Sequence, residues 1–222
     1  MTSDQAIEVF QDLTFYVPEA SREAFREALI AQADGGWSHN TDSEKKITQV
    51  FGSDEDVIVF TRTADENVDA VSLFLFSCDE GYRVTNIVPL EQHELGQRRY
   101  NIALVNFIQQ VGEPVVSKFG FSTDLTSSEQ SLDDWMSETT ASALRSFSAL
   151  ANKGTGSSHP LDRKRWFKFL ISLHNDHGNF DTDRLARWLI EVEGWGEDAA
   201  RDLVGECDFA LQILNAYDQI GE

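Results

Sequence analysis

The stretch from Val68 to Val88 decides the fold of this 222-residue chain, and it reads Val-Asp-Ala-Val-Ser-Leu-Phe-Leu-Phe-Ser-Cys-Asp-Glu-Gly-Tyr-Arg-Val-Thr-Asn-Ile-Val. Side chains alternate between the two faces of a strand, and here the middle of both rows is apolar. One row holds Val71, Leu73 and Leu75, and the other holds Ala70, Phe74 and Phe76. A strand that is apolar on both faces is usually covered on both, so this strand is predicted to lie centrally in its sheet.

The three residues Asp79-Glu80-Gly81 are predicted to turn the chain back into a second, antiparallel strand. Gly81 can adopt positive φ, which suits a three-residue hairpin turn with a bulge. The register that follows from this turn has three pairs: Cys78 with Tyr82, Phe76 with Val84, and Phe74 with Asn86. This hairpin is the predicted nucleus of the fold.

Strand and helix signals surround the hairpin in the first 120 residues. The predicted elements are a strand at 7–17, a helix from Pro18 to the glycines at 35–36, a loop at 37–44, and strands at 46–51 and 57–63. An amphipathic helix follows at 97–111, with Gly112 and Pro114 ending it and irregular chain at 113–130. The connections are short, so the sheet is predicted to have about five strands that are mostly antiparallel.

Strand signals vanish from residue 131 onward, and helix signals replace them. Ser131-Leu-Asp-Asp134 resembles a capping box, Pro160 opens a helix, and Asp181 caps the next one. A last long helix runs to Gly221, and the stretch 152–158 resembles a linker. The sequence therefore predicts an α+β fold, with a sheet domain at 1–120 and a helical subdomain at 121–222.

The composition is that of a folded cytoplasmic protein. The chain is 41% hydrophobic, which argues against wholesale disorder. No apolar run approaches the roughly 20 residues that a membrane span needs, and the first residues lack the features of a signal peptide. Cys78 and Cys207 lie far apart and are predicted to be reduced, buried thiols.

Acidic residues dominate the charge of the chain. The formal net charge is −20, and residues 1–90 carry 17 acids against 6 bases. Such a field repels nucleic acid and anionic membranes and attracts basic partners. The plainer alternative is that the acids only keep the protein soluble.

The leading functional hypothesis is a non-enzymatic binding protein that engages a basic protein partner, in the manner of an immunity protein or antitoxin. Its candidate contacts are acids at the ends of predicted strands, namely Asp54, Glu55, Asp56, Asp65, Glu66, Asp79 and Glu80. Acids at these positions also keep sheet edges soluble, which is the alternative role for them. Trp195 lies between two glycines at a break in the helices, where a tryptophan can anchor a partner.

The segment His174-Asn-Asp-His177, with Asp181 shortly after it, has the best spacing for a metal site. Imidazole and carboxylate groups together bind zinc and other divalent ions. The alternative is an ordinary polar loop in which Asp181 caps a helix. No other cofactor is expected. The second functional hypothesis is accordingly a metal-dependent or acid–base hydrolase that uses His174, His177 and Asp181.

The densest basic cluster comprises residues 163–165 and Lys168, and Trp166 and Phe167 interrupt it. Basic residues between aromatics can bind the nucleic-acid backbone or a phosphate group. The net negative field opposes nucleic acid and favours a solvated helix face that pairs with nearby acids. The sequence contains neither a Gly-x-Ser-x-Gly elbow nor a Walker loop, so it offers no recognisable nucleophile or nucleotide site.

Overall fold

Two compact units make up the chain. The computed structural model describes residues 6–51, 56–91, 94–176 and 180–221. At 51 and 221 it describes the backbone alone. Residues 8–128 form the sheet unit, and the described residues before and after it form the helical unit. The predicted boundary at 120 lies earlier in the chain than Ser128. The difference is the strand β7 (Ser122–Leu125), which pairs with the sheet.

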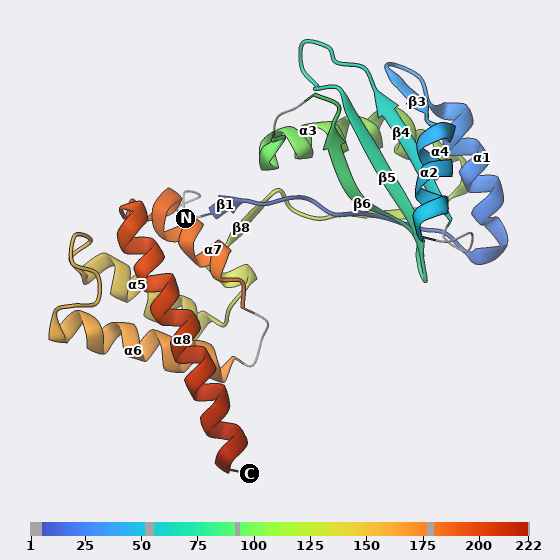
Figure 1. Cartoon of the computed structure of the whole chain (residues 1–222). Helices are drawn as coiled ribbons and strands as arrows, with labels where there is room; N and C mark the ends of the chain where they lie inside the picture. Colours follow the sequence, from blue (N-terminus) through green and yellow to red (C-terminus); the bar gives the residue numbers. More distant parts are fainter. Residues whose placement is uncertain (1–5, 52–55, 92–93, 177–179, 222) are drawn as a thin grey trace. The chain divides into compact units, whose positions relative to one another are not determined.

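The sheet has six strands in the described part of the chain, and every neighbouring pair is antiparallel. In spatial order they are β3 (Trp37–His39), β4 (Val57–Arg62), β5 (Val71–Cys78), β6 (Gly81–Pro89), β2 (Leu13–Tyr16) and β7. The predicted α+β class and the internal position of β5 are confirmed (Figure 1). On β5, Leu73 and Leu75 are fully buried, whereas Phe74 and Phe76 on the opposite face are only half-buried.

The β5–β6 hairpin forms, with a tighter turn than predicted. Phe74 pairs with Asn86 as expected, but Cys78 pairs with Gly81 and Phe76 with Arg83, so those two predicted pairs are wrong by one residue. The bulge lies at Thr85, between the partners of Phe74 and Leu75, and not at the turn. The reason is that Gly81 belongs to the ladder, where its missing side chain lets β2 approach.

Three helices of the sheet unit cover one face of the sheet. They are α1 (Arg22–Gln32, preceded by the short η1 at Glu19–Ser21), α3 (Gly96–Phe107) and α4 (Glu113–Phe119), the last two joined by the π-turn η2 (Ile108–Gly112). Phe25, Leu104 and Phe107 pack with Phe15, Leu73 and Leu75 in one continuous core. Burial of this apolar surface is the main stabilising contribution to the unit.

Three predictions for the sheet unit are wrong. The predicted strand at 7–17 is two strands, β1 (Ala6–Glu8) and β2, because the chain at 9–12 leaves the ladder. The predicted loop and strand over 37–51 are β3 and the helix α2 (Thr41–Phe51), which Asn40 caps through the N–H of Ser43. Gly112 and Pro114 do not end the helical path, because the π-turn leads directly into α4; the predicted irregular stretch therefore contains α4, β7 and β8 (Glu129–Ser131).

The helical unit follows its sequence signals closely. Its helices are α5 (Glu138–Leu150), α6 (Pro160–Asn175), α7 (Thr182–Arg187) and α8 (Glu197–Gly221), with the short turns η3 (Leu132–Asp134) and η4 (Trp188–Val192). The Ser131–Asp134 capping box, the Pro160 start and the Asp181 cap are all confirmed. Phe147, Trp166 and Trp188 are fully buried. None of the helices in the described ranges is long and apolar enough to traverse a bilayer.

Candidate functional site

The strand-end acids divide into two groups at opposite ends of the sheet. Asp56 lies at the same end as the Asp79-Glu80 turn, because its carbonyl oxygen accepts the N–H of Ser77. Asp65 and Glu66 follow the far end of β4. The six residues of β4 span about 20 Å at ~3.4 Å per residue. Asp54 and Glu55 lie outside the described residues.

Several of these acids are already paired within the chain. Asp56 accepts hydrogen bonds from Arg26 at 2.8 Å and from the Tyr82 hydroxyl at 2.5 Å. Burial and this hydrogen bond raise the pKa of Tyr82 well above its ordinary value. The N–H groups of Asn67 and Val68, with the guanidinium of Arg62, lower the pKa of Asp65. These pairs leave less free negative charge at the strand ends than the sequence alone indicates.

Two of the predicted metal ligands, His174 and Asp181, contact other side chains of the protein. His174 Nε2 lies 2.7 Å from Asp218 Oδ2 on α8. The Asp181 carboxylate accepts the N–H of Asp183 at 2.9 Å and faces Arg184 at 3.2 Å, as a helix cap does. His177 lies outside the described residues. Within the described ranges, no three His, Cys, Asp or Glu side chains are grouped so that they could hold a metal ion.

Trp195 is part of the core of the helical unit. Its side chain is only 3% exposed, its indole N–H donates to Ser148 Oγ at 2.7 Å, and its ring stacks on Phe147. A partner anchor needs an accessible ring. We therefore leave Trp195 out of the proposed interaction surface.

The two cysteines are unpaired and poorly suited to nucleophilic chemistry. Burial is the main cause that raises the pKa of Cys207 to about 12, so its thiol is protonated at neutral pH. Cys78 is half-buried, and its Sγ lies 3.8 Å from Glu80 Oε2. A neighbouring carboxylate does not activate a thiol, because thiolates are stabilised by positive charge.

The feature that the sequence did not reveal is an open edge on β6. The ladder between β2 and β6 has only three pairs and stops at Thr14 with Arg83; the next residue of β2, Leu13, pairs with β7 alone. From Val84 to Pro89, therefore, β6 has a ladder partner on the β5 side only. An unpaired strand edge presents backbone donors and acceptors to anything that lies beside it.

Hydrogen bonds to α3 and to the chain after β7 draw residues 9–12 away from β6. The buried Asn101 donates to the Val9 carbonyl at 2.8 Å and accepts the N–H of Gln11 at 2.9 Å. The Gln11 side chain donates to the Thr126 carbonyl at 2.6 Å, and Thr126 also bonds the backbone of Asp12. These bonds satisfy the backbone of the segment away from the ladder, and they fix the point where β2 leaves β6.

The register identifies the backbone groups at the open edge. The N–H of Leu90 donates to the carbonyl of Ala70, on the β5 side. Leu90 and Ala70 are therefore a hydrogen-bonded pair of the ladder. Hydrogen-bonded pairs alternate along an antiparallel ladder, and Val88 and Asn86 are the next such residues. The N–H and C=O of Ile87 consequently face away from β5. No described residue bonds them.

A groove of about 700 Å³ lies along this edge. Residues 85–89 of β6 form one wall, and Phe10, Asp12 and residues 94–97 with Tyr100 form the rest. Phe10 is 51% exposed and meets the Tyr100 ring edge-on at 5.0 Å between centroids. Burial, with the charge of Asp12, raises the pKa of Tyr100 to about 12. The groove thus combines open backbone groups with an accessible aromatic side chain.

The sequence did contain one signal of this edge. Buried residues alternate without a break through Ile7, Val9, Gln11, Leu13, Phe15 and Val17. Apolar alternation therefore could not show that the strand is interrupted. The polar Gln11 in the buried row was the indication, since a buried amide needs partners that a strand core does not supply.

Comparison with known proteins gives one partial match. A family model described as "Domain of unknown function (DUF1889)" matches residues 136–209. This segment begins just before α5 and ends within α8, so it covers a third of the chain. No curated protein and no solved structure matches the chain. The chain is thus similar to this family within the helical unit.

Proposed function

We propose that the protein is a non-enzymatic binding protein whose sheet unit takes up an extended segment of a basic protein partner along the open edge of β6. The observation that carries the proposal is the early end of the β2–β6 ladder at Arg83. A segment laid against Ile87 would occupy the position that β2 leaves, and it would satisfy the free N–H and C=O there. Strand addition of this kind is a recurring mode of peptide recognition.

The charge of the groove favours a basic segment. Asp12 and Glu94 belong to its wall, and none of its described lining residues is Lys or Arg. The whole stretch 8–128 carries 20 acids against 9 bases. In such a field, Lys or Arg side chains of a bound strand are attracted, and acidic ones are repelled.

Side chains of an added strand would alternate between two environments. One row would meet Phe10 and Tyr100 on the face that the helices cover, and the other would lie beside Val88 on the opposite face and point to solvent. A segment in which apolar and basic residues alternate fits both rows. An immunity- or antitoxin-like neutraliser of a basic protein is the concrete biological form that we propose.

Selection of heptapeptides displayed on phage against the immobilised full-length chain tests this function. We expect the enriched peptides to alternate apolar with Lys or Arg residues, and to bind with Kd of about 1–100 μM, which corresponds to roughly −8 to −5.5 kcal/mol. Raising the salt concentration should weaken binding, because the charges concerned are exposed.

N-methylation of the selected peptide is the matched control for strand addition. Methyl groups on one set of alternate amides should abolish binding, and methyl groups on the other set should leave it intact, because only one set faces β6. Equal tolerance of both sets, or enrichment of acidic peptides, would contradict the proposal.

A further inference from the structure

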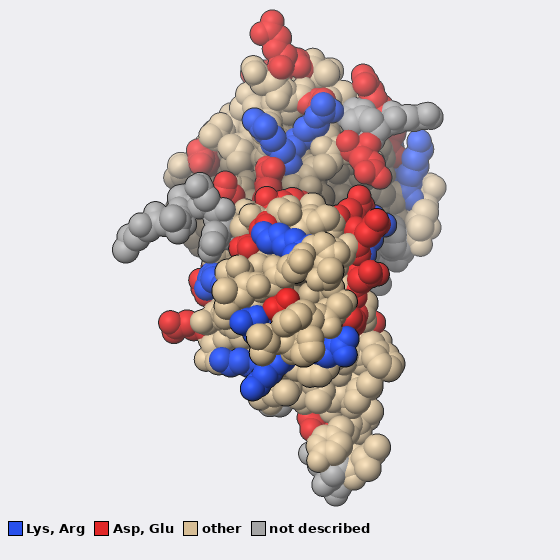
Figure 2. All heavy atoms as spheres, turned by 90° about the vertical axis from the view of Figure 1, so that its left-hand side faces the viewer, with Lys and Arg blue, Asp and Glu red and all other residues tan. Residues whose placement is uncertain are grey.

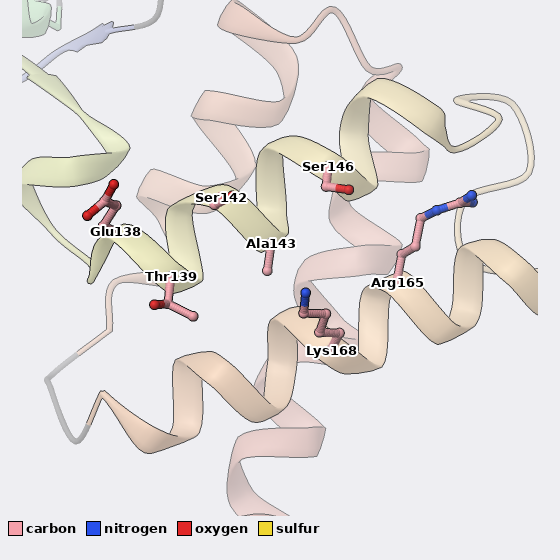
Figure 3. Close-up of a pocket in the computed structure, with 7 residues that line it drawn as sticks. All are labelled: Glu138, Thr139, Ser142, Ala143, Ser146, Arg165 and Lys168. Atoms are coloured by element: carbon pink, nitrogen blue, oxygen red, sulfur yellow. The ribbon is translucent and has the colours of Figure 1, made fainter.

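The helical unit contains a second groove, which lies between α5 and α6 (Figure 3). Its volume is about 390 Å³, and its described lining residues are Glu138, Thr139, Ser142, Ala143, Ser146, Arg165 and Lys168. Residues three and four apart share a helix face, which is why these positions point to one side of each helix. The groove lies wholly within the segment that matches the DUF1889 family.

Two cations line the α6 side of this groove. The guanidinium of Arg165 is held by a 2.8 Å bond to Asp162, a carboxylate that is itself buried, so the position of Arg165 is fixed. Lys168 forms no ion pair with any residue in the described ranges. Figure 3 shows its amine directed toward α5, beside Ala143. Lys168 is thus a cation without a counter-ion at the groove.

Three hydroxyl groups line the α5 side. Thr139, Ser142 and Ser146 follow one another along the exposed face of the helix, and Ala143 between them is small and buried. Neither of the two serine hydroxyls bonds another described side chain. Figure 3 places Glu138, the only acid of the lining, at the end of α5 far from Arg165. Ser146 and Arg165 therefore lie toward one end of the groove, and Thr139 and Glu138 lie toward the other.

This concentration of positive charge stands out in an acidic chain. Residues 129–222 hold 9 bases, of which Arg163, Lys164, Arg165 and Lys168 lie within two turns of α6. Figure 2 shows several Lys and Arg side chains over the helical unit, on the side of it that the view displays. The surroundings oppose anions at long range, so any anion bound here must be recognised by local contacts.

We infer that the α5–α6 groove binds a small phosphate monoester. The phosphoryl group would lie between Arg165, Lys168 and Ser146, since ammonium, guanidinium and hydroxyl donors suit its three terminal oxygens. The hydroxylated part of the ester would lie toward Ser142 and Thr139, whose hydroxyl groups can donate and accept hydrogen bonds. A small dianion is favoured over a nucleic acid because a polyanion would meet the net charge of −20 over a larger surface. This site is independent of the β6 edge.

Titration of the full-length chain with glycerol 3-phosphate, followed by 1H–15N NMR, tests the inference. We expect saturable shifts at α5 and α6 residues with Kd of about 1 mM or lower. Inorganic phosphate should shift the same residues more weakly, and glycerol should shift none. An oligonucleotide that binds more tightly than the ester would overturn the assignment to a small ligand.

Matched variants on α6 separate a built site from general attraction. Lys168→Ala should weaken glycerol 3-phosphate binding about tenfold, as expected for loss of one charge-assisted hydrogen bond. Ser146→Ala should weaken it about threefold, and Arg163→Ala, which removes an exposed charge outside the groove, less than twofold. Lys168 and Arg163 are both exposed, so their alanine variants should fold. Equal effects of Lys168→Ala and Arg163→Ala, or no saturation by 10 mM ester or so, would overturn the inference.

Discussion

Gly81→Ala is expected to lower the free energy of unfolding of the sheet unit by about 3–5 kcal/mol. Gly81 has φ of 149°, and a Cβ at this position would lie 2.2 Å from the Phe15 carbonyl oxygen and 2.6 Å from the Val17 nitrogen. Both contacts are with backbone atoms of β2 or of Val17, the residue that follows it, and this backbone cannot move aside without breaking the ladder. Urea unfolding followed by the far-ultraviolet circular dichroism signal measures the effect.

Gly96→Ala is the matched control. Gly96 also has positive φ, at 66°, but nothing lies within 4 Å of a Cβ added there. We expect a cost of about 1–2 kcal/mol from the left-handed backbone alone. Equal destabilisation by the two variants would show that β2 does not approach Gly81 as closely as described, and would put in doubt the register of the β2–β6 ladder.

Phe10→Ala is expected to weaken binding of a selected basic peptide by about 10- to 30-fold, or roughly 1.4–2 kcal/mol. Phe10 is the most accessible aromatic side chain of the β6 groove, and Tyr100 holds its ring edge-on. Aromatic residues at the centre of an interface supply much of its binding energy. Fluorescence anisotropy of the labelled peptide measures the change.

Val50→Ala provides the comparison for Phe10. Val50 is 77% exposed on α2 of the same unit and does not line the groove. Its replacement should change the peptide Kd by less than twofold, since surface substitutions outside an interface have small effects. Peptide affinity that survives Phe10→Ala unchanged would place the peptide elsewhere on the protein.

Local sequence signals predicted the helical unit well because they act over a few residues. The Ser131–Asp134 capping box, Pro160 at the start of α6 and Asp181 at the start of α7 each satisfy the backbone of their own helix. Their chemistry needs no distant partner. The sequence therefore indicated the starts of α6 and α7 correctly. The start of the preceding helix was predicted too early, because the capping box opens only the three-residue η3, and α5 begins at Glu138 with Ser137 as its cap.

The errors in the sheet unit arise where a distant residue decides the local structure. Asn101 on α3 redirects residues 9–12, which lie about 90 positions earlier in the chain. Likewise, the apolar residues Ile47 and Val50 fit a helix face as well as a strand, and the cap at Asn40 favours the helix. Gln11 signals that the strand is interrupted, but the open edge of β6 also depends on where β2 goes, which these distant partners decide.

The predicted functional residues also depend on residues that are distant in the sequence. The α+β class followed from β5, but acids counted in the sequence gave no indication that Arg26 and Arg62 would pair with Asp56 and Asp65. The basic cluster on α6 was visible in the sequence, whereas the hydroxyl row opposite it depends on how α5 packs. Charge can be counted from a sequence, but its compensation is set by the fold.

Amide hydrogen exchange of the free protein, resolved by NMR at the residues of β6, tests the central claim most directly. If the edge is open, the Ile87 N–H should exchange at least about 100-fold faster than those of Asn86 and Val88, whose hydrogen bonds to β5 protect them. Addition of a selected peptide should then slow exchange at Ile87. Protection of Ile87 equal to that of Val88 in the free protein would contradict the open edge and the function proposed from it.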